Sequence, residues 1–409
     1  MSTFAPSRRG QEAPASPIRR LMPHCEFARE RGARVLHLNI GQPDIPTPKR
    51  MLDAYRSFAE PVLAYGASEG QLPYRQALAD YYNGLGAADA GTRLLASQVL
   101  VTVGGSEALL FAIAATCDPG DDVLVVEPFY PNYKGFSYML AVGIRAVTTT
   151  VDEEFALPVE RLKAAIGSRT RALIVSSPGN PTGAVFSAAE LTAIGQVCVE
   201  YGIFFICDEV YRDFVYDGSG KAASVLAIPG LDQSAIMIDS VSKRYSACGA
   251  RVGCLVTRNA QVYAAALKYA QTRLSPPVVD QLAALAALQT PDSDLAVIIE
   301  NYKARRDALV AGLNALPGVS ASTPAGAFYL IVQLPVQDAE AFCVFLLREF
   351  DLDGETVMLA PADGFYATPG LGRNEVRAAY VLEVPKLLRA VAILGAGLRA
   401  FAERRVVAA

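Results

Sequence analysis

Residues 50 to 285 alternate helical patterns with short apolar runs, and these runs set the expected architecture. Several runs are continuously apolar, which is typical of strands that are buried on both faces of a sheet. Strands joined through helices predict a mostly parallel, seven-stranded α/β sheet that is flanked by helices. The expected strands are residues 99–103, 122–127, 144–150, 171–177, 204–209, 235–242 and 251–257.

The two ends of the chain follow a different pattern. Apolar residues at positions 18, 21, 22 and 25 have helical spacing, and residues 35–40 form an expected strand. Further expected strands are residues 328–334, 357–360 and 376–382, with helices over 294–316 and near 337–350 and 384–404. We therefore expect an N-terminal arm and small-domain segment (1–48), a large domain (49–290) and a small α+β C-terminal domain (291–409). The cleft between such domains usually holds the ligand.

Composition argues against several classes of function. Hydrophobic residues make up 52% of the 409 residues and charged residues 19%, which disfavours a disordered regulator. A net charge of −4 disfavours a general nucleic-acid binder, which would carry a basic face. His24 and His37 are the only histidines, so we expect neither a Ser-His-Asp triad in the central region nor a His-rich metal site.

The cysteines and the N-terminal segment bear on location. Seven cysteines are scattered through the chain without a CxxC pair, which favours buried reduced thiols and a cytoplasmic protein. The first 20 residues lack the continuous apolar core of a secretory signal. No apolar stretch reaches about 18 residues, so we expect no membrane span.

Polar residues follow the expected strands, at the sheet edge where open α/β folds bind ligands. Gly105 and Ser106 come after the first strand and open a helix, where backbone N–H groups favour an anion such as a phosphate. The same Gly-Gly-Ser turn is also common without a ligand. It matches neither GxxxxGK[ST] nor GxGxxG, so nucleotide-binding folds lose support. Tyr130 follows the second strand and either stacks on a planar ring or packs in the core.

Three later strand ends add an amide, an acid and an amine. Asn180 lies in a Pro/Gly-rich turn that either reverses the chain or holds the amide in a fixed pose. Asp208 ends an apolar strand, where an acid is costly unless it is paired, and this favours a functional role. Lys243 is a candidate Schiff-base lysine, since desolvation frees its amine as a nucleophile. Ser240 and Arg251 are candidate anion ligands beside it.

Taken in order, these residues resemble the class I and II aminotransferases, which are fold-type I pyridoxal 5′-phosphate (PLP) enzymes. The strongest match is Ser-x-Ser-Lys-x-x-Ser-x-x-Gly-x-Arg-x-Gly at residues 240–253. Other matches are Asn-Pro-Thr-Gly at 180–183, Asp-Glu-Val-Tyr at 208–211, Gly-Gln-Pro-Asp at 41–44, Tyr65-Gly66 with Gly70 and Leu72, and Val-Arg-Ala-Ala-Tyr at 376–380. The resemblance covers the chain from about Leu38 onward. It implies the fold-type I transferase fold, with a seven-stranded large domain and a smaller α+β domain.

The resemblance also implies a role for each matching residue. Lys243 binds the cofactor as a Schiff base and shuttles the proton of Cα, and Asp208 pairs with the pyridinium nitrogen. The other implied cofactor contacts come from Tyr211, Asn180 and Tyr130 to the ring, from Gly105, Ser106, Glu107, Ser240 and Arg251 to the phosphate, and from Tyr65 to the phosphate of the neighbouring subunit. Arg377 binds the substrate α-carboxylate, helped by Gly41 and Asn180.

The implied activity is transfer of an amino group from an L-amino acid, aspartate or a broader set, to a 2-oxo acid such as 2-oxoglutarate, in a homodimer with sites at the interface. A PLP-dependent lyase, decarboxylase or cyclising enzyme shares Lys243 and Asp208 and remains the alternative. A non-catalytic PLP-binding regulator would need a DNA-binding module, and the arm before residue 16 is too short for one.

Two features leave the substrate side chain open. The loop at 360–370 departs from the Pro-Gly-x-x-Phe loop of many relatives. Arg273 is either a cation for a distal substrate carboxylate or a structural arginine. The chain has no Trp, so Tyr130 takes the stacking position that Trp holds in some members.

Overall fold

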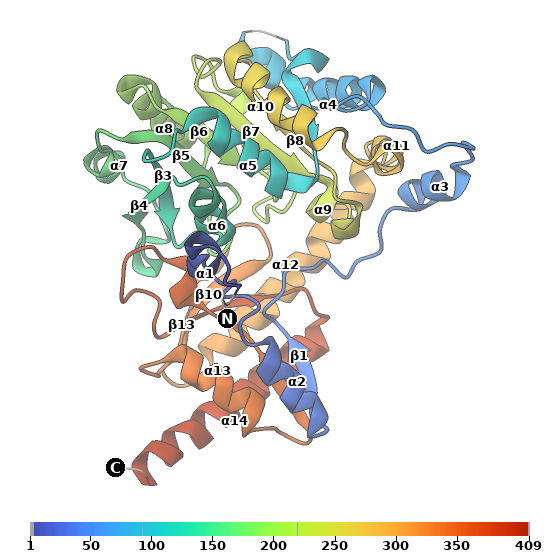
Figure 1. The fold of residues 1–409 in the computed structure, drawn as a ribbon. Helices are drawn as coiled ribbons and strands as arrows, with labels where there is room; N and C mark the ends of the chain where they lie inside the picture. Colours follow the sequence, from blue (N-terminus) through green and yellow to red (C-terminus); the bar gives the residue numbers. More distant parts are fainter. Residues whose placement is uncertain (1–3, 92, 219, 408–409) are drawn as a thin grey trace.

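The computed structural model describes residues 4–91, 93–218 and 220–407. A seven-stranded sheet forms the core of the larger part of the molecule, at the top of Figure 1. Its order is β2-β8-β7-β6-β5-β3-β4. β8 runs antiparallel to both neighbours and the other pairs are parallel. The strands are β2 (Val99–Thr102), β3 (Asp122–Glu127), β4 (Gly143–Thr148), β5 (Thr170–Ser176), β6 (Phe204–Asp208), β7 (Ala235–Ser240) and β8 (Gly253–Val256). The expected mostly parallel α/β sheet is confirmed.

Helices cover both faces of this sheet, which explains the continuously apolar strands. Because successive side chains of a strand point to opposite faces, Ile174 of β5 packs in one core cluster and Leu173 in the other. The helices of one face are α5 (Gly104–Thr116), α6 (Asn132–Met139) and α10 (Ala260–Arg273). Those of the other are α3 (Lys49–Ser57), α4 (Leu72–Gly84), α7 (Val159–Ala165), α8 (Ala188–Tyr201) and α11 (Val278–Ala287). Local signals set their ends: α8 begins with a capping box of Ser187 and Glu190.

The long helix α12 (Asp292–Asn314) leads to a smaller α+β part (Figure 1). There β1 (Arg34–His37) pairs in parallel with β11 (Glu355–Met358), so a segment near the N-terminus completes the C-terminal part. An antiparallel sheet has the order β12-β13-β10-β9. Its strands are β9 (Ser320–Ala321), β10 (Tyr329–Gln333), β12 (Ala360–Pro361) and β13 (Glu375–Ala379). The helices are α2 (Met22–Glu30), α13 (Ala339–Arg348) and α14 (Val384–Val407).

Two details refine the sequence-based expectations. The single strand expected at 357–360 is two strands, because β11 joins β1 whereas β12 joins β13. The N-terminal arm holds a short helix, α1 (Arg8–Glu12), and Arg9 donates to the carbonyl of Met139 in α6.

No single helix in the described ranges is both long and apolar enough to cross a membrane. The helices α11 and α12 meet that test only as a pair, with a 90° bend between them. The domain division at residues 48 and 290 stays a prediction, and residues 1–3 and 408–409 of its outer segments lie outside the described residues.

Five charged side chains are buried together at the carboxyl ends of β6 and β7. This buried ion cluster consists of Glu209, Arg212, Asp213, Asp239 and Arg244, each at most 4% exposed. Arg212 Nε donates to Glu209 at 2.8 Å. Arg244 donates to Asp213 and, at 2.6 Å, to Asp239. Each acid therefore has a guanidinium partner, which offsets the cost of removing these charges from water.

The buried ion cluster lies directly beside two residues that the sequence singles out. Glu209 follows Asp208, and Arg244 follows Lys243. Since adjacent residues at a strand end face opposite ways, Glu209 points into the cluster while Asp208 is left on the other side. The cluster thus holds the backbone next to both Asp208 and Lys243.

We expect Arg244→Met to lower the free energy of unfolding by about 3–5 kcal/mol, because Asp213 and Asp239 would lose their closest cation inside the protein. The matched control is Arg93→Met. Arg93 bonds to Asp80 with 65% of its side chain exposed, and an exposed pair contributes about 0–1 kcal/mol. Urea unfolding followed by circular dichroism measures both variants. Equal losses of stability would contradict the role given to the cluster.

Candidate active site

A cavity of about 450 Å³ lies between the carboxyl ends of the large sheet and the C-terminal part. Most of the predicted site residues line it: Gly41, Gly105, Ser106, Tyr130, Asn180, Asp208, Tyr211, Ser240, Lys243, Arg251 and Arg377. Segments that are far apart in the chain, from Ile18 near one end to Arg377 near the other, therefore meet at one place. Glu107 and Tyr65 are the two predicted residues that are not part of this lining.

Asp208 ends β6 and is 4% exposed. Its Oδ2 accepts a hydrogen bond from Tyr133 at 2.7 Å, and its Oδ1 accepts one from the backbone N–H of Val210 at 3.4 Å. Burial raises the pKa of Asp208 to about 6, against the effect of these two donors. A cation placed beside this carboxylate would lower its pKa again. Asp208 therefore offers the cavity a negative charge that suits a protonated ring nitrogen.

Lys243 lies in α9 (Val241–Arg244), which Ser240 caps by accepting from the N–H of Ser242. The Lys243 Nζ donates to the carbonyl of Gly41 at 2.9 Å and lies 3.7 Å from Cys248 Sγ. Within the described residues it has no carboxylate partner. An amine that is held only by a carbonyl and a thiol is available to react with an aldehyde.

The start of α5 forms an anion cradle. No side chain caps this helix, so the first backbone N–H groups, including those of Gly105 and Ser106, are open. Gly104 has φ +73°, and a Cβ there would lie 2.4 Å from Nη2 of Arg251. Glycine at this position thus lets the guanidinium approach the helix start. Open N–H groups beside an arginine suit a phosphate.

Arg377 of β13 is 1% exposed and has no acidic partner in the described structure. Its Nη1 donates to Oδ1 of Asn180 at 3.0 Å, its Nη2 donates to the carbonyl of Asn39, and its Nε has no partner. The guanidinium lies 4.4 Å from the ring centre of Tyr329. Burial lowers the pKa of Arg377. A buried cation without an acid is costly, so this part of the cavity is built to receive an anion.

Sequence reasoning missed two tyrosines that touch the predicted residues. The hydroxyls of Tyr329 and Tyr211 are 3.0 Å apart, and a Cβ on Gly41 would lie 1.7 Å from the Tyr329 hydroxyl, so only glycine fits there. Tyr329 starts an apolar strand, where an aromatic residue suggests only core packing. Tyr133 holds Asp208, and its position one helical turn after Tyr130 was a signal that could have found it.

The remaining candidates lie outside the cavity. Tyr65 is 81% exposed on the loop between α3 and α4. The Glu107 carboxylate accepts from the N–H of Val103 at 2.8 Å and from Arg273 Nε at 3.2 Å. Arg273 also donates to two backbone carbonyls. In this chain Arg273 is therefore tied into the protein near α5 rather than presented to a substrate.

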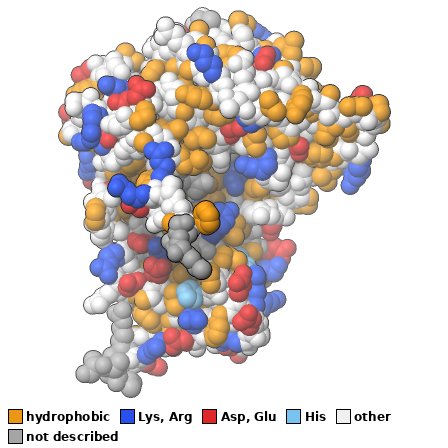
Figure 2. All heavy atoms as spheres, in the orientation of Figure 1, with side chains coloured by type: hydrophobic (Ala, Val, Ile, Leu, Met, Phe, Trp, Pro, Cys, Tyr) orange, Lys and Arg blue, Asp and Glu red, His pale blue; other side chains and the backbone are white. Residues whose placement is uncertain are grey.

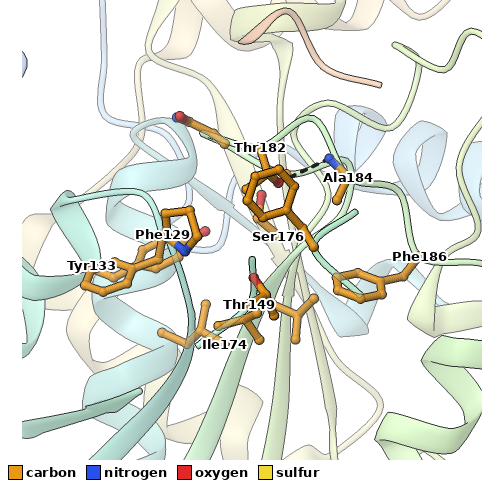
Figure 3. A pocket seen from close by; sticks show the side chains of 14 residues that line it. Phe129, Tyr133, Thr149, Ile174, Ser176, Thr182, Ala184 and Phe186 are labelled. Atoms are coloured by element: carbon orange, nitrogen blue, oxygen red, sulfur yellow. Dashed lines mark hydrogen bonds between the residues drawn. The ribbon is translucent and has the colours of Figure 1, made fainter. Parts of the chain in front are cut away.

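A separate cavity of about 30 Å³ is lined by Tyr133 and by the turn that carries Asn180 (Figure 3). Figure 3 shows that Phe129, Ile174 and Phe186 wall it in, and that Ala184 donates its N–H to Thr182 Oγ1, at 3.2 Å. Such a space suits about one water molecule, whereas ligand pockets usually have about 300–1,000 Å³. The cavity that the predicted residues line is therefore the candidate active site.

The residues of this cavity fit pyridoxal phosphate. Three features of one cavity match three parts of this cofactor. Lys243 offers an amine for the aldehyde, and Asp208 offers a buried carboxylate for the ring nitrogen. The start of α5, with Arg251, offers an anion cradle for the phosphate. The unpartnered Nε of the buried Arg377 leaves a separate place for a second anion.

Comparison with known proteins assigns the family. The family model of aminotransferases of class I and II matches residues 33–378. The chain is 32% identical to the aspartate/prephenate aminotransferase of Thermus thermophilus, over 74% of this chain and 78% of that protein. It is 30% identical to the aspartate aminotransferase of Geobacillus stearothermophilus, over 88% and 90%.

Solved structures agree with this assignment. The Thermus thermophilus aspartate aminotransferase with maleate has a TM-score of 0.87 and 28% identity, over 97% of this chain and 100% of that chain. An alanine aminotransferase from Pyrococcus furiosus gives the same TM-score, identity and coverage. The chain belongs to the class I and II aminotransferases and is a PLP-dependent enzyme that transfers amino groups.

Proposed function

We propose that the chain moves the amino group of an L-amino acid, with aspartate as the first candidate, to a 2-oxo acid such as 2-oxoglutarate. The observation that carries this proposal is the buried Arg377, which has no acidic partner and lines the same cavity as Lys243. Paired guanidinium N–H groups match a carboxylate, so Arg377 suits the α-carboxylate of an amino acid. Aspartate is favoured because relatives from Thermus thermophilus and Geobacillus stearothermophilus carry that name.

The side chains divide the work of the reaction. When bound, PLP supplies the electron sink that allows the Cα–H bond of the amino acid to break. Lys243 would hold the cofactor through its amine, and the same amine would move the proton of the substrate Cα. Asp208 would keep the ring nitrogen protonated, because an opposite charge favours the charged form. Arg377 and Asn180 would bind and orient the α-carboxylate of the substrate.

The other predicted residues hold the cofactor in this proposal. Tyr130 would stack on the cofactor ring, and its edge-to-face contact with Tyr133, with ring centres 5.7 Å apart, orients the Tyr130 side chain. Tyr211 and Asn180 would hold the 3-oxygen. Gly105, Ser106, Ser240 and Arg251 would hold the phosphate, with the backbone of Glu107.

An exposed apolar segment supports a homodimer. Val62, Leu63 and Tyr65 on the loop between α3 and α4, and Leu72 at the start of α4, are 60–81% exposed. Figure 2 shows hydrophobic side chains gathered on the projection that carries α3 in Figure 1. Exposed apolar side chains gathered in this way are typical of a protein interface. We infer a two-fold dimer in which Tyr65 reaches the phosphate in the partner's cavity. We also place the protein in the reducing cytoplasm, because its seven cysteines are free thiols.

Borohydride reduction tests the attachment of the cofactor. We expect the purified, PLP-loaded protein to be yellow, and reduction to fix the mass of the cofactor on the peptide that contains Lys243. Peptide mass spectrometry locates the label, and Lys243→Ala is the control that should remove it. A label on another lysine would refute the assignment.

The charge of Asp208 should cost stability when the cofactor is absent. Because burial raises its pKa from 3.8 to about 6, the folded apoprotein binds this proton more tightly than the unfolded chain. Stability therefore falls as the pH rises from about 4 to 6 and stays lower above that window, by about 3 kcal/mol for a shift of about two units. Asp208→Asn keeps an oxygen for Tyr133 and removes the titration.

We therefore expect apo Asp208→Asn to be more stable than the parent at pH 7.5 and equal to it near pH 4. With PLP bound, the advantage should shrink or reverse, because the ring cation stabilises the parent's carboxylate. Urea unfolding of both proteins at several pH values measures this. A variant that is less stable than the apo parent at pH 7.5 would show that Asp208 is stabilised as an anion by something other than the cofactor.

Mixing of subunits tests the shared site. A Lys243→Ala chain and a Tyr65→Ala chain should together form heterodimers with one intact site, which has Lys243 from one chain and Tyr65 from the other. Random pairing gives about half heterodimers with one working site of two, hence about a quarter of the parent's activity. A partner that carries Tyr65→Ala and Arg377→Ala is the control, and it should restore nothing. No recovery in the first mixture, with subunit exchange verified, argues against a shared site.

A further inference from the structure

One cation of the active-site cavity has no role in the reaction as described so far. The cavity is lined by Arg19, Lys243, Arg251 and Arg377, against a single acid, Asp208. The aldehyde and phosphate of the cofactor and the α-carboxylate of the substrate account for three of these cations. The Arg19 side chain is exposed, and its guanidinium has no hydrogen bond or ion pair within the described residues. It is a cation without a counter-charge.

The turn that carries Arg19 is firmly held, so its position is a property of the fold. The neighbouring Arg20 points the other way and forms ion pairs with Glu340, at 2.9 Å, and with Asp363. Pro17 packs on Gly364, where an added Cβ would lie 2.4 Å from the proline ring. Arg19 is thus presented to the cavity by a turn that is fixed on both sides.

Asn39 links this turn to the carboxylate site. Its carbonyl accepts from Arg377, and its side-chain amide donates to the carbonyl of Ile18 at 3.2 Å. The charges of both arginines act on the Tyr130 hydroxyl. Burial raises the pKa of this phenol to about 12, and the positive charges of Arg377 and Arg19 both act to lower that pKa. Both arginines therefore line the same cavity as Tyr130 and are close enough for their charges to act on its hydroxyl.

We propose that Arg19 binds the distal carboxylate of a dicarboxylic amino acid or 2-oxo acid while Arg377 binds the α-carboxylate. The inference rests on the proposed function and names its substrate class. Ile18 and Ile40 also line the cavity, but they are apolar and cannot pair with a distal carboxylate. Arg273, the other candidate from the sequence, is bound to Glu107. A substrate without a second carboxylate would form no ion pair with Arg19, so Arg19 would not strengthen its binding.

Steady-state kinetics test the proposal with Arg19→Gln and with substrates that differ in the distal group. Loss of a charged hydrogen bond corresponds to a factor of about 10–100. We expect kcat/KM to fall by that factor for aspartate and to change less than about twofold for alanine. Arg19→Lys keeps the charge without the paired donors, so it should recover part of the loss for aspartate.

Binding of maleate, a dicarboxylate that carries no amino group to transfer, gives a readout apart from turnover. Titration of the PLP-loaded protein, followed by calorimetry, should show a dissociation constant that rises by about 10–100-fold in Arg19→Gln. Propionate, which has one carboxylate, should bind the parent and the variant alike. Arg93→Gln is the matched control, because Arg93 is exposed, pairs with Asp80 and does not line the cavity; it should leave the ratio of aspartate to alanine activity unchanged.

The outcomes separate the two proposals. Equal losses for aspartate and alanine, or unchanged maleate binding in Arg19→Gln, would overturn the role of Arg19 and leave the aminotransferase proposal intact. A parent enzyme that prefers alanine to aspartate would also overturn it. A parent that converts no amino acid at all would refute the proposed function, and maleate binding would still decide whether Arg19 reads a second carboxylate.

Discussion

The burial of charge at the carboxyl edge of the large sheet is the constraint on which the rest of the structure depends. Strand alternation sends Glu209 into the buried ion cluster and leaves Asp208 beside the cavity. In the buried ion cluster, each of the three acids has a guanidinium partner. In the cavity, Asp208 has only hydrogen-bond donors and Arg377 has only uncharged acceptors and rings. The chain thus neutralises the charges that position the site and leaves unpaired the charges that a ligand would meet.

This difference in charge pairing lowers the stability of the folded protein until a ligand binds to the site. Burial works against the charged form of both Asp208 and Arg377, and each such charge lowers the stability of the empty protein. A ligand that binds only the folded state returns stability in proportion to the logarithm of its concentration over its dissociation constant. The same unpaired charges therefore link the binding of cofactor and substrate to the stability of the fold. Functional sites commonly contain such locally unfavourable features.

The residues that line the cavity from the large sheet could be predicted from the sequence, because each belongs to a short recognisable segment. Lys243, Asp208, Asn180 and Gly105 each follow an apolar strand, and the strands bring their carboxyl ends to one edge. Tyr329 and Arg19 could not be found in this way, since neither follows a strand of the large sheet and their contacts exist only in the folded chain. The strand expected at 357–360 was split for the same reason: apolar residues alone do not say which sheet a strand joins.

The substrate side is assembled from remote segments, and this explains why the reaction was easier to predict than its substrate. The unusual loop after β12 is fastened to the large sheet, where Glu127 accepts from the N–H groups of Ala367 and Thr368 at 2.7 and 3.0 Å. The same loop carries Asp363, which pairs with Arg20 beside Arg19. The loop also contacts the cavity wall, since the N–H of Phe129 donates to the carbonyl of Phe365 and the Arg377 guanidinium lies 5.0 Å from the Phe365 ring centre. A change in this loop is therefore expected to shift the N-terminal turn and Arg377, which lie on the proposed substrate side, while Lys243 lies on a different segment of the chain.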